Sequence, residues 1–174
     1  MADEETIRAR RRWFDAYVGH VQEAGTRSYS PDSFSGKFNC PCCGYPTLDE
    51  RCGWEICYLC NWEDDGQDDH NADRVLSGPN AGYSLTLARE NFKRYGNMYT
   101  PGNDQRIVAG DCDTESTAKE RIIEAFEAMK TASDEGIVGY WCIVNQGREE
   151  LSRELDRRIE EFEQKIMSDR NKQP

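Results

Sequence analysis

Apolar residues recur at steps of three and four along three stretches of the chain, a spacing that places their side chains on one face of an α-helix. The pattern predicts three helices, at residues 4–23, 84–96 and 113–131. Ser84 is suited to cap the second helix, and Asp113 or Thr114 the third. The apolar faces of the first and third helices are Ile7, Phe14, Tyr17, Val18 and Val21, and Ala118, Ile122, Ala125, Phe126 and Met129. Arginines 8 and 10–12 are expected to form a solvated flank of the first helix.

The C-terminal third carries two patterns. Residues 136–145 (GIVGYWCIVN) are β-branched and aromatic, so they predict one buried strand, for which residues 106–109 are the candidate partner. From Gly147 onward, helical steps return and predict a charged helix of about 22 residues with one narrow apolar stripe. The stripe consists of Leu151, Leu155, Ile159, Phe162 and Ile166. It packs either on the body of the protein or against another helix.

Charge and hydropathy restrict the classes of partner. The chain has 33 acidic and 22 basic residues, a net charge of −11, whereas a surface that binds a phosphate backbone is positively charged. We therefore predict no nucleic-acid partner. No stretch is apolar enough to cross a membrane or to act as a secretory signal, so we expect a cytoplasmic protein without membrane contact. Clustered cysteines in the reducing cytosol bind metal more often than they form disulfides.

Four of the eight cysteines form two C-x-x-C pairs, Cys40 with Cys43 and Cys57 with Cys60. The pairs are separated by 13 residues, which is close to the spacing of zinc sites built from two such pairs. Gly44 follows the first pair, where the chain must turn sharply and glycine adopts a positive φ at least cost. The sequence therefore predicts one structural Zn²⁺ bound by Cys40, Cys43, Cys57 and Cys60.

The other cysteines are predicted not to bind this metal. Cys42 adjoins Cys43, and two adjacent residues do not easily reach one ion, although the sequence leaves open which of them is the ligand. Cys52 lies between the pairs and is expected to be free. Cys112 and Cys142 are isolated, and Cys142 is expected to be a small buried hydrophobe in the predicted strand. Thiol redox chemistry is the competing interpretation, but it usually uses one pair in a βαβ context, which is missing here.

An acidic run, WEDDGQDDH, occupies residues 62–70. Its spacing does not match the calcium loop of an EF-hand. Because charged runs are usually exposed, we expect a solvated loop that caps nearby backbone or docks a basic partner, with His70 on the surface. The candidate partner-binding residues are Glu63, Asp64, Asp65, Asp68 and Asp69.

The motif CPCCG at residues 40–44, followed by EICYLCNWEDD at residues 55–65, resembles the bacterial cysteine-rich CPCC family. Downstream matches, beginning with GPN at residues 78–80, extend the resemblance over residues 38–96. Cys52 departs from it, because a glycine is expected there. The resemblance implies a small zinc-ribbon-like module rather than an enzymatic activity. Similar domains occur in bacterial toxin and immunity neighbourhoods.

These patterns predict an α+β protein in which a zinc-ribbon-like module with two zinc knuckles lies among amphipathic helices and a long C-terminal helix. The expected divisions are an N-terminal helix at 1–30, the CPCC domain at 38–96, and a mainly helical region with one strand at 105–174. We expect a non-enzymatic, zinc-stabilised immunity protein that neutralises a basic bacterial toxin. Two alternatives stay open, a nucleic-acid-binding regulator and an enzyme that uses Cys42, Cys43 or Cys52 as a reactive thiol. The oligomeric state also stays open.

Overall fold

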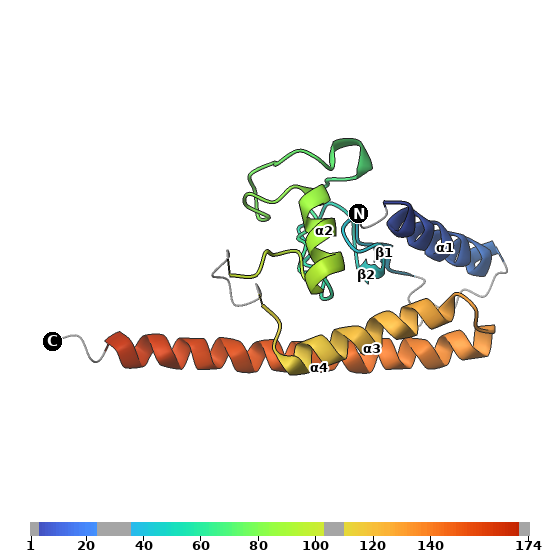
Figure 1. The fold of residues 1–174 in the computed structure, drawn as a ribbon. Helices are drawn as coiled ribbons and strands as arrows, with labels where there is room; N and C mark the ends of the chain where they lie inside the picture. The colour runs from blue at the N-terminus through green and yellow to red at the C-terminus, as the bar shows by residue number, and fades with distance from the viewer. Residues whose placement is uncertain (1–3, 24–35, 103–109, 171–174) are drawn as a thin grey trace.

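The computed structural model describes residues 4–23, 36–102 and 110–170. A small cysteine-rich body that carries helix α2 is flanked by helix α1 and rests on a long hairpin of helices α3 and α4 (Figure 1). The elements are α1 (Glu4–Glu23), β1 (Phe38–Asn39), β2 (Pro46–Leu48), the 3-10 helix η2 (Asp69–Asn71), α2 (Leu85–Tyr95), α3 (Asp113–Met129) and α4 (Asp134–Arg170). Strands β1 and β2 pair antiparallel. The predicted α+β class is confirmed.

The three helices predicted from periodicity are present. The Ser84 side chain accepts a hydrogen bond from the Leu87 N–H and begins α2, while Gly96, with a φ of 70°, ends it. The N-cap of α3 is Cys112 and not the predicted Asp113 or Thr114, and the Cys112 N–H donates to the Glu115 carboxylate at 2.8 Å. None of the helices in the described ranges is long and apolar enough to cross a membrane.

The predicted strand at residues 136–145 is wrong, because these residues form the first turns of α4. The buried positions on α4 follow steps of four, three, three and four: Ile137, Trp141, Val144, Gly147 and Leu151. Packing against α3 therefore overrides the strand preference of β-branched residues. The Cys142 side chain is exposed, so its prediction as a buried hydrophobe is also wrong. The candidate partner strand at 106–109 lies outside the described residues.

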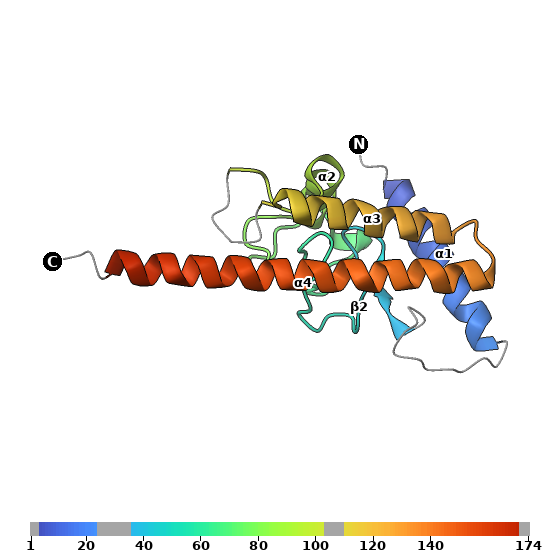
Figure 2. The same cartoon turned by 90° about the horizontal axis from the view of Figure 1, so that it is seen from below.

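Helix α4 packs closely against α3 at Gly147. A Cβ atom added there would lie 2.6 Å from Cγ1 of Ile122, so a larger residue would require the Ile122 side chain to shift. The predicted apolar face of α3 is buried in full. At the open end of the hairpin, where α3 begins, the Cys112 thiol lies 3.3 Å from the Glu154 carboxylate. Helix α4 continues for several turns past this point (Figures 1 and 2).

Aromatic rings join α1 and α3 to the cysteine-rich body. The Phe126 ring of α3 stacks on Tyr45 at 5.1 Å between centroids and meets the edge of Phe14 of α1 at 5.6 Å. Of the α1 arginines predicted to form a solvated flank, Arg8 and Arg12 are exposed, whereas Arg10 and Arg11 are not. Arg10 pairs with Glu127 of α3 at 3.0 Å, and Arg11 is also partly buried. Helix α1 is thus attached to the body by both apolar and charged contacts.

Candidate metal centre

Each C-x-x-C pair lies in a tight turn with the same hydrogen bonds. Around the first pair, the Cys40 N–H donates to the Tyr45 carbonyl and the Gly44 N–H donates to the Cys40 carbonyl, both at 2.9 Å. The equivalent bonds around Cys57 measure 2.9 and 2.8 Å. The first turn connects β1 to β2, and the second is closed by an isolated antiparallel bridge. The body therefore presents two similar turns that face one another.

The residue after each pair adopts a left-handed backbone conformation. Gly44 has a φ of 79°, as the sequence predicts. Asn61 has a φ of 62° and occupies the equivalent position in the second turn. Asparagine is among the residues that tolerate this region best, but we did not predict this role from the sequence. Cys52, with a φ of 60°, also occupies a conformation that favours glycine.

The four predicted ligands converge. Their sulfur atoms all lie within 4.8 Å of one another, and each residue is fully buried. The Cys40 and Cys60 sulfurs are 3.6 Å apart, and the Cys43 and Cys57 sulfurs 3.7 Å apart. A tetrahedral zinc site with Zn–S bonds of about 2.3 Å has sulfurs about 3.8 Å apart, whereas a disulfide bond measures about 2.05 Å. The arrangement fits a tetrahedral metal ion.

The structure places Cys43, not Cys42, in this cluster. Cys42 is fully buried beside it. Cys52 is exposed, and Cys112 at the start of α3 lies against Glu154, so neither reaches the cluster.

Burial and hydrogen bonding act in opposite directions on the four thiols. Burial raises the pKa of Cys40, Cys43 and Cys60 well above the usual value. Burial also acts on Cys57, but hydrogen bonds from the other three thiols and from the Thr47 hydroxyl, at 3.0 Å, outweigh it and lower the pKa of Cys57. Four thiolates this close would repel one another, so a cation among them is needed to hold all four deprotonated.

Helices α1 and α2 donate hydrogen bonds to the first cysteine turn. Arg10 of α1 donates to the Cys43 carbonyl at 3.3 Å. Arg89 of α2, which is 3% exposed, donates twice to the Pro41 carbonyl, at 3.0 and 2.8 Å. These contacts fix the turn from two sides. Sequence analysis missed both arginines, because a polar residue on an amphipathic helix gives no sign that it is buried.

The acidic run is largely part of the internal structure. Asp64 is fully buried and accepts hydrogen bonds from the Arg51 guanidinium and the Cys52 N–H, both at 2.8 Å. The prediction of a solvated loop is therefore wrong at this residue. His70 is exposed, as expected.

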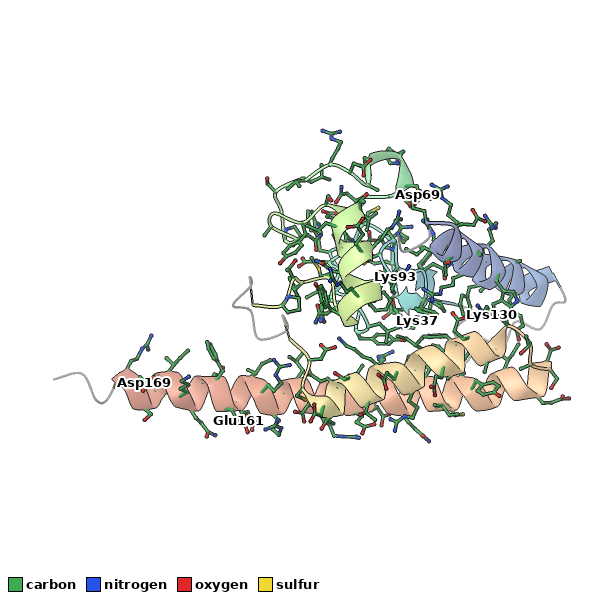
Figure 3. The ribbon with its side chains drawn as sticks, viewed as in Figure 1. Lys37, Asp69, Lys93, Lys130, Glu161 and Asp169 are labelled. Atoms are coloured by element: carbon green, nitrogen blue, oxygen red, sulfur yellow. The ribbon has the colours of Figure 1, made fainter. Side chains whose placement is uncertain are left out.

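Two further acids of the run pair with arginines of the helices. Asp68 accepts from Arg11 at 2.9 Å, and Asp69 accepts from Arg89 at 2.6 Å. Asp69 lies beside the N-terminal half of α1 (Figure 3). Within the described residues, Glu63 has a carboxylate that accepts no hydrogen bond. A role of the run in partner binding stays a prediction.

Comparison with known proteins places the cysteine turns in a family. Residues 38–108 match the family described as Cysteine-rich CPCC. This range includes both cysteine pairs and α2. No curated protein and no solved structure matches the chain. The resemblance seen in the CPCCG and WEDD motifs is thus confirmed over residues 38–108, which are similar to the cysteine-rich CPCC family.

Proposed function

We propose that this chain is a non-enzymatic binding protein stabilised by one structural Zn²⁺ on Cys40, Cys43, Cys57 and Cys60. The observation that carries the proposal is the convergence of four fully buried sulfurs. A site with four cysteine ligands is closed, whereas catalytic zinc keeps a position open for water or substrate. Burial supports the same assignment, since a substrate has no path to the ion.

A metal here would supply much of the folding free energy. Structural zinc contributes on the order of 10 kcal/mol in small domains. The four ligands lie in the same buried cluster as Phe14, Leu85 and Phe126, from three helices. Loss of the ion would leave four sulfurs without a partner at the centre of that cluster. We therefore expect the apo protein to lose the packing of these helices.

Native mass spectrometry of the freshly purified chain tests the metal. The expected result is the mass of one zinc per chain, with four cysteines protected from a thiol reagent until a chelator is added. Cys57→Ser should lose the ion, and Cys142→Ser, at an exposed cysteine outside the cluster, is the matched control. A metal-free wild-type chain whose mass shows paired cysteines would refute the zinc site and favour thiol redox chemistry.

For the partner, we propose a basic bacterial toxin that this acidic chain binds and neutralises. Its net charge of −11 supports this choice, because such a charge attracts a basic protein at long range. The α1 arginines pair with Asp68, Asp69 and Glu127, which weakens the case for nucleic acid. Glu63 and the exposed acids of α3 and α4 are the candidate contact residues.

Co-expression with a basic toxin encoded beside the gene tests this proposal. We expect a complex that weakens as salt rises and that protects the host cell. Absence of both the complex and the protection would reject the immunity role and leave the metal assignment untouched. Salt-sensitive binding to nucleic acid in a gel shift would favour the regulator instead.

A further inference from the structure

A hollow of about 260 Å³ lies where helices α1, α2 and α3 meet the cysteine-rich body. The four clustered cysteines do not line it, so it is separate from the metal centre. Its volume is below the roughly 300–1,000 Å³ of sites for drug-sized ligands, so it is suited to a smaller molecule. Its walls are mainly apolar, and each of the four parts contributes a side chain: Ile7 of α1, Tyr45 of the body, Phe92 of α2 and Ile123 of α3.

The charged side chains that line this hollow are all basic. They are Arg10 of α1 and Arg89 and Lys93 of α2, and no acidic residue of the described ranges lines the hollow with them. Lys93 is exposed and lies at the rim, on the side of α2 that faces α1 (Figure 3). In a chain of net charge −11, three cations around one apolar hollow favour an anionic ligand.

Two of these cations are held in place by the protein. Arg10 pairs with Glu127 through Nε at 3.0 Å and donates from Nη1 to a carbonyl of the first cysteine turn. Arg89 donates from Nε and Nη2 to the Pro41 carbonyl, and from Nη2 also to Asp69. Neither Glu127 nor Asp69 lines the hollow. The two guanidinium groups are therefore fixed before a ligand arrives, which reduces the entropy lost on binding.

One terminal nitrogen of each arginine is unused. Within the described residues, Nη2 of Arg10 and Nη1 of Arg89 donate no hydrogen bond. Neither atom is among the buried polar atoms that lack a partner, so solvent reaches both. Because both residues line the hollow, these nitrogens are available as donors to a ligand inside it. Two charged donors from two helices suit a carboxylate, which has two acceptor oxygens.

We propose that this hollow binds a small monocarboxylate with an apolar body. The carboxylate oxygens accept hydrogen bonds from Nη2 of Arg10 and Nη1 of Arg89, and Lys93 adds a positive charge at the rim. The apolar body of the ligand covers the apolar walls, and its burial there is favourable. Inorganic phosphate matches the charge but has no apolar surface to cover these walls.

A ligand bound in this way would join α1 to α2. The same two arginines donate to the carbonyls of Cys43 and Pro41 in the first cysteine turn. The ligand would thus strengthen the attachment of both helices to the cysteine-rich body. Because the hollow exists only in the folded chain, binding should also raise the midpoint of thermal unfolding.

An NMR titration of the purified wild-type chain with phenylacetate and with hexanoate tests the proposal. We expect amide shifts around the hollow that saturate at one ligand per chain, with a Kd on the order of 1 mM or below for at least one of the two acids. Phenylacetamide and hexanamide keep the apolar body but lose the charge, so they should bind about tenfold more weakly or worse. Inorganic phosphate should cause no saturable shift at these residues.

Two pairs of variants place the ligand in the hollow. Lys93→Glu reverses a charge at the rim, and Arg94→Glu is its matched control at the next residue of α2, outside the hollow. Thr6→Trp fills the hollow from an exposed position of α1, and Ala9→Trp adds the same ring at an exposed position of α1 outside the hollow. We expect Lys93→Glu and Thr6→Trp to weaken binding about tenfold, and each control to change it less than about twofold. Circular dichroism checks that each variant is folded.

Several results would overturn the proposal. One is the absence of saturable shifts with both acids at about 10 mM, well above the expected Kd. Others are equal binding of the acids and their amides, binding of phosphate as tight as that of phenylacetate, and binding that neither Lys93→Glu nor Thr6→Trp weakens. All these measurements are made without a protein partner, so this proposal and the toxin-binding function fail or succeed separately.

Discussion

Arg89 donates two hydrogen bonds to the carbonyl oxygen of Pro41, across 48 positions of the chain. The same guanidinium contacts Asp69 at 2.6 Å and is almost fully buried. Replacing Arg89 with methionine would leave the Pro41 carbonyl without this donor and would remove the shortest of the arginine contacts to Asp69. We expect the free energy of unfolding to fall by about 3 kcal/mol, measured by urea unfolding at fixed zinc concentration.

Arg89→Lys is the control for this effect. Lysine keeps the charge near Asp69 but lacks the planar fork that donates twice to one carbonyl, so it should recover only part of the loss. Competition with a zinc chelator adds a second measurement. If Arg89→Met left both the stability and the zinc affinity unchanged, Arg89 would have no role in holding the first cysteine turn.

Asn61 stands in the second cysteine turn where Gly44 stands in the first. Both have positive φ values, 62° and 79°, so a Cβ atom at position 61 carries a backbone cost. Asn61→Gly and Asn61→Ala lose the same side-chain contacts and differ in this cost. We expect the alanine variant to be less stable than the glycine variant by about 1 kcal/mol in thermal unfolding. Equal stabilities would show that the left-handed conformation is not maintained in solution.

Acid should weaken the attachment of α1 to the acidic run. Burial raises the pKa of Asp68, but hydrogen bonds from Arg11 and from the Asp69 N–H outweigh it and leave the pKa lowered. A carboxylate whose pKa is lowered by folding contributes stability above its unfolded pKa of about 4, and this contribution is lost as the pH falls toward the folded value. Wild-type stability should therefore decline below about pH 4 partly through Asp68.

Asp68→Asn tests this contribution, since asparagine retains one side-chain oxygen to cap η2 but loses the charge and the second oxygen, which accepts from Arg11 and Arg51. Acid also affects the four clustered cysteines in both proteins, so the difference between the two proteins is the quantity to measure. We expect the variant to be less stable at pH 7 and the difference to shrink as the pH falls below about 4. A difference that stays constant with pH would exclude the ion pairs of Asp68 with Arg11 and Arg51 as its source.

Spacing along the chain predicted which four cysteines converge but not the residues around them. Each C-x-x-C turn is formed by residues close together in the sequence, so their spacing is enough to predict it. The glycine after Cys43 is likewise predicted from the geometry of the turn alone. Thr47 lies four positions after Cys43 in a buried strand and bonds to Cys57, and nothing in its neighbours indicates this contact. Arg89 and Asp64 are buried by packing between segments far apart in sequence, which a pattern of single residues does not encode.

The strand predicted at residues 136–145 failed for a related reason. Its composition favours extended structure, yet Ile137, Trp141 and Val144 also fit a helical period that continues into Leu151. Composition describes each residue alone, whereas the period shows which side chains share a partner. Here that partner is α3, and burial against it exceeds a difference in β-propensity of at most about 1 kcal/mol.

The contact between Gly147 and Ile122 provides a sharp test of this hairpin. A methyl group at position 147 would lie 2.6 Å from Cγ1 of Ile122, so Gly147→Ala should reduce the free energy of unfolding by about 1–3 kcal/mol despite the better helix propensity of alanine. Gly139 lies in the same helix with no atom near its added Cβ, so Gly139→Ala should stabilise the protein by up to about 1 kcal/mol. Urea unfolding of both variants measures the two signs. If both alanines stabilised the protein, α3 and α4 would not pack at this distance, and the helix over residues 134–147 would have to be held by other contacts.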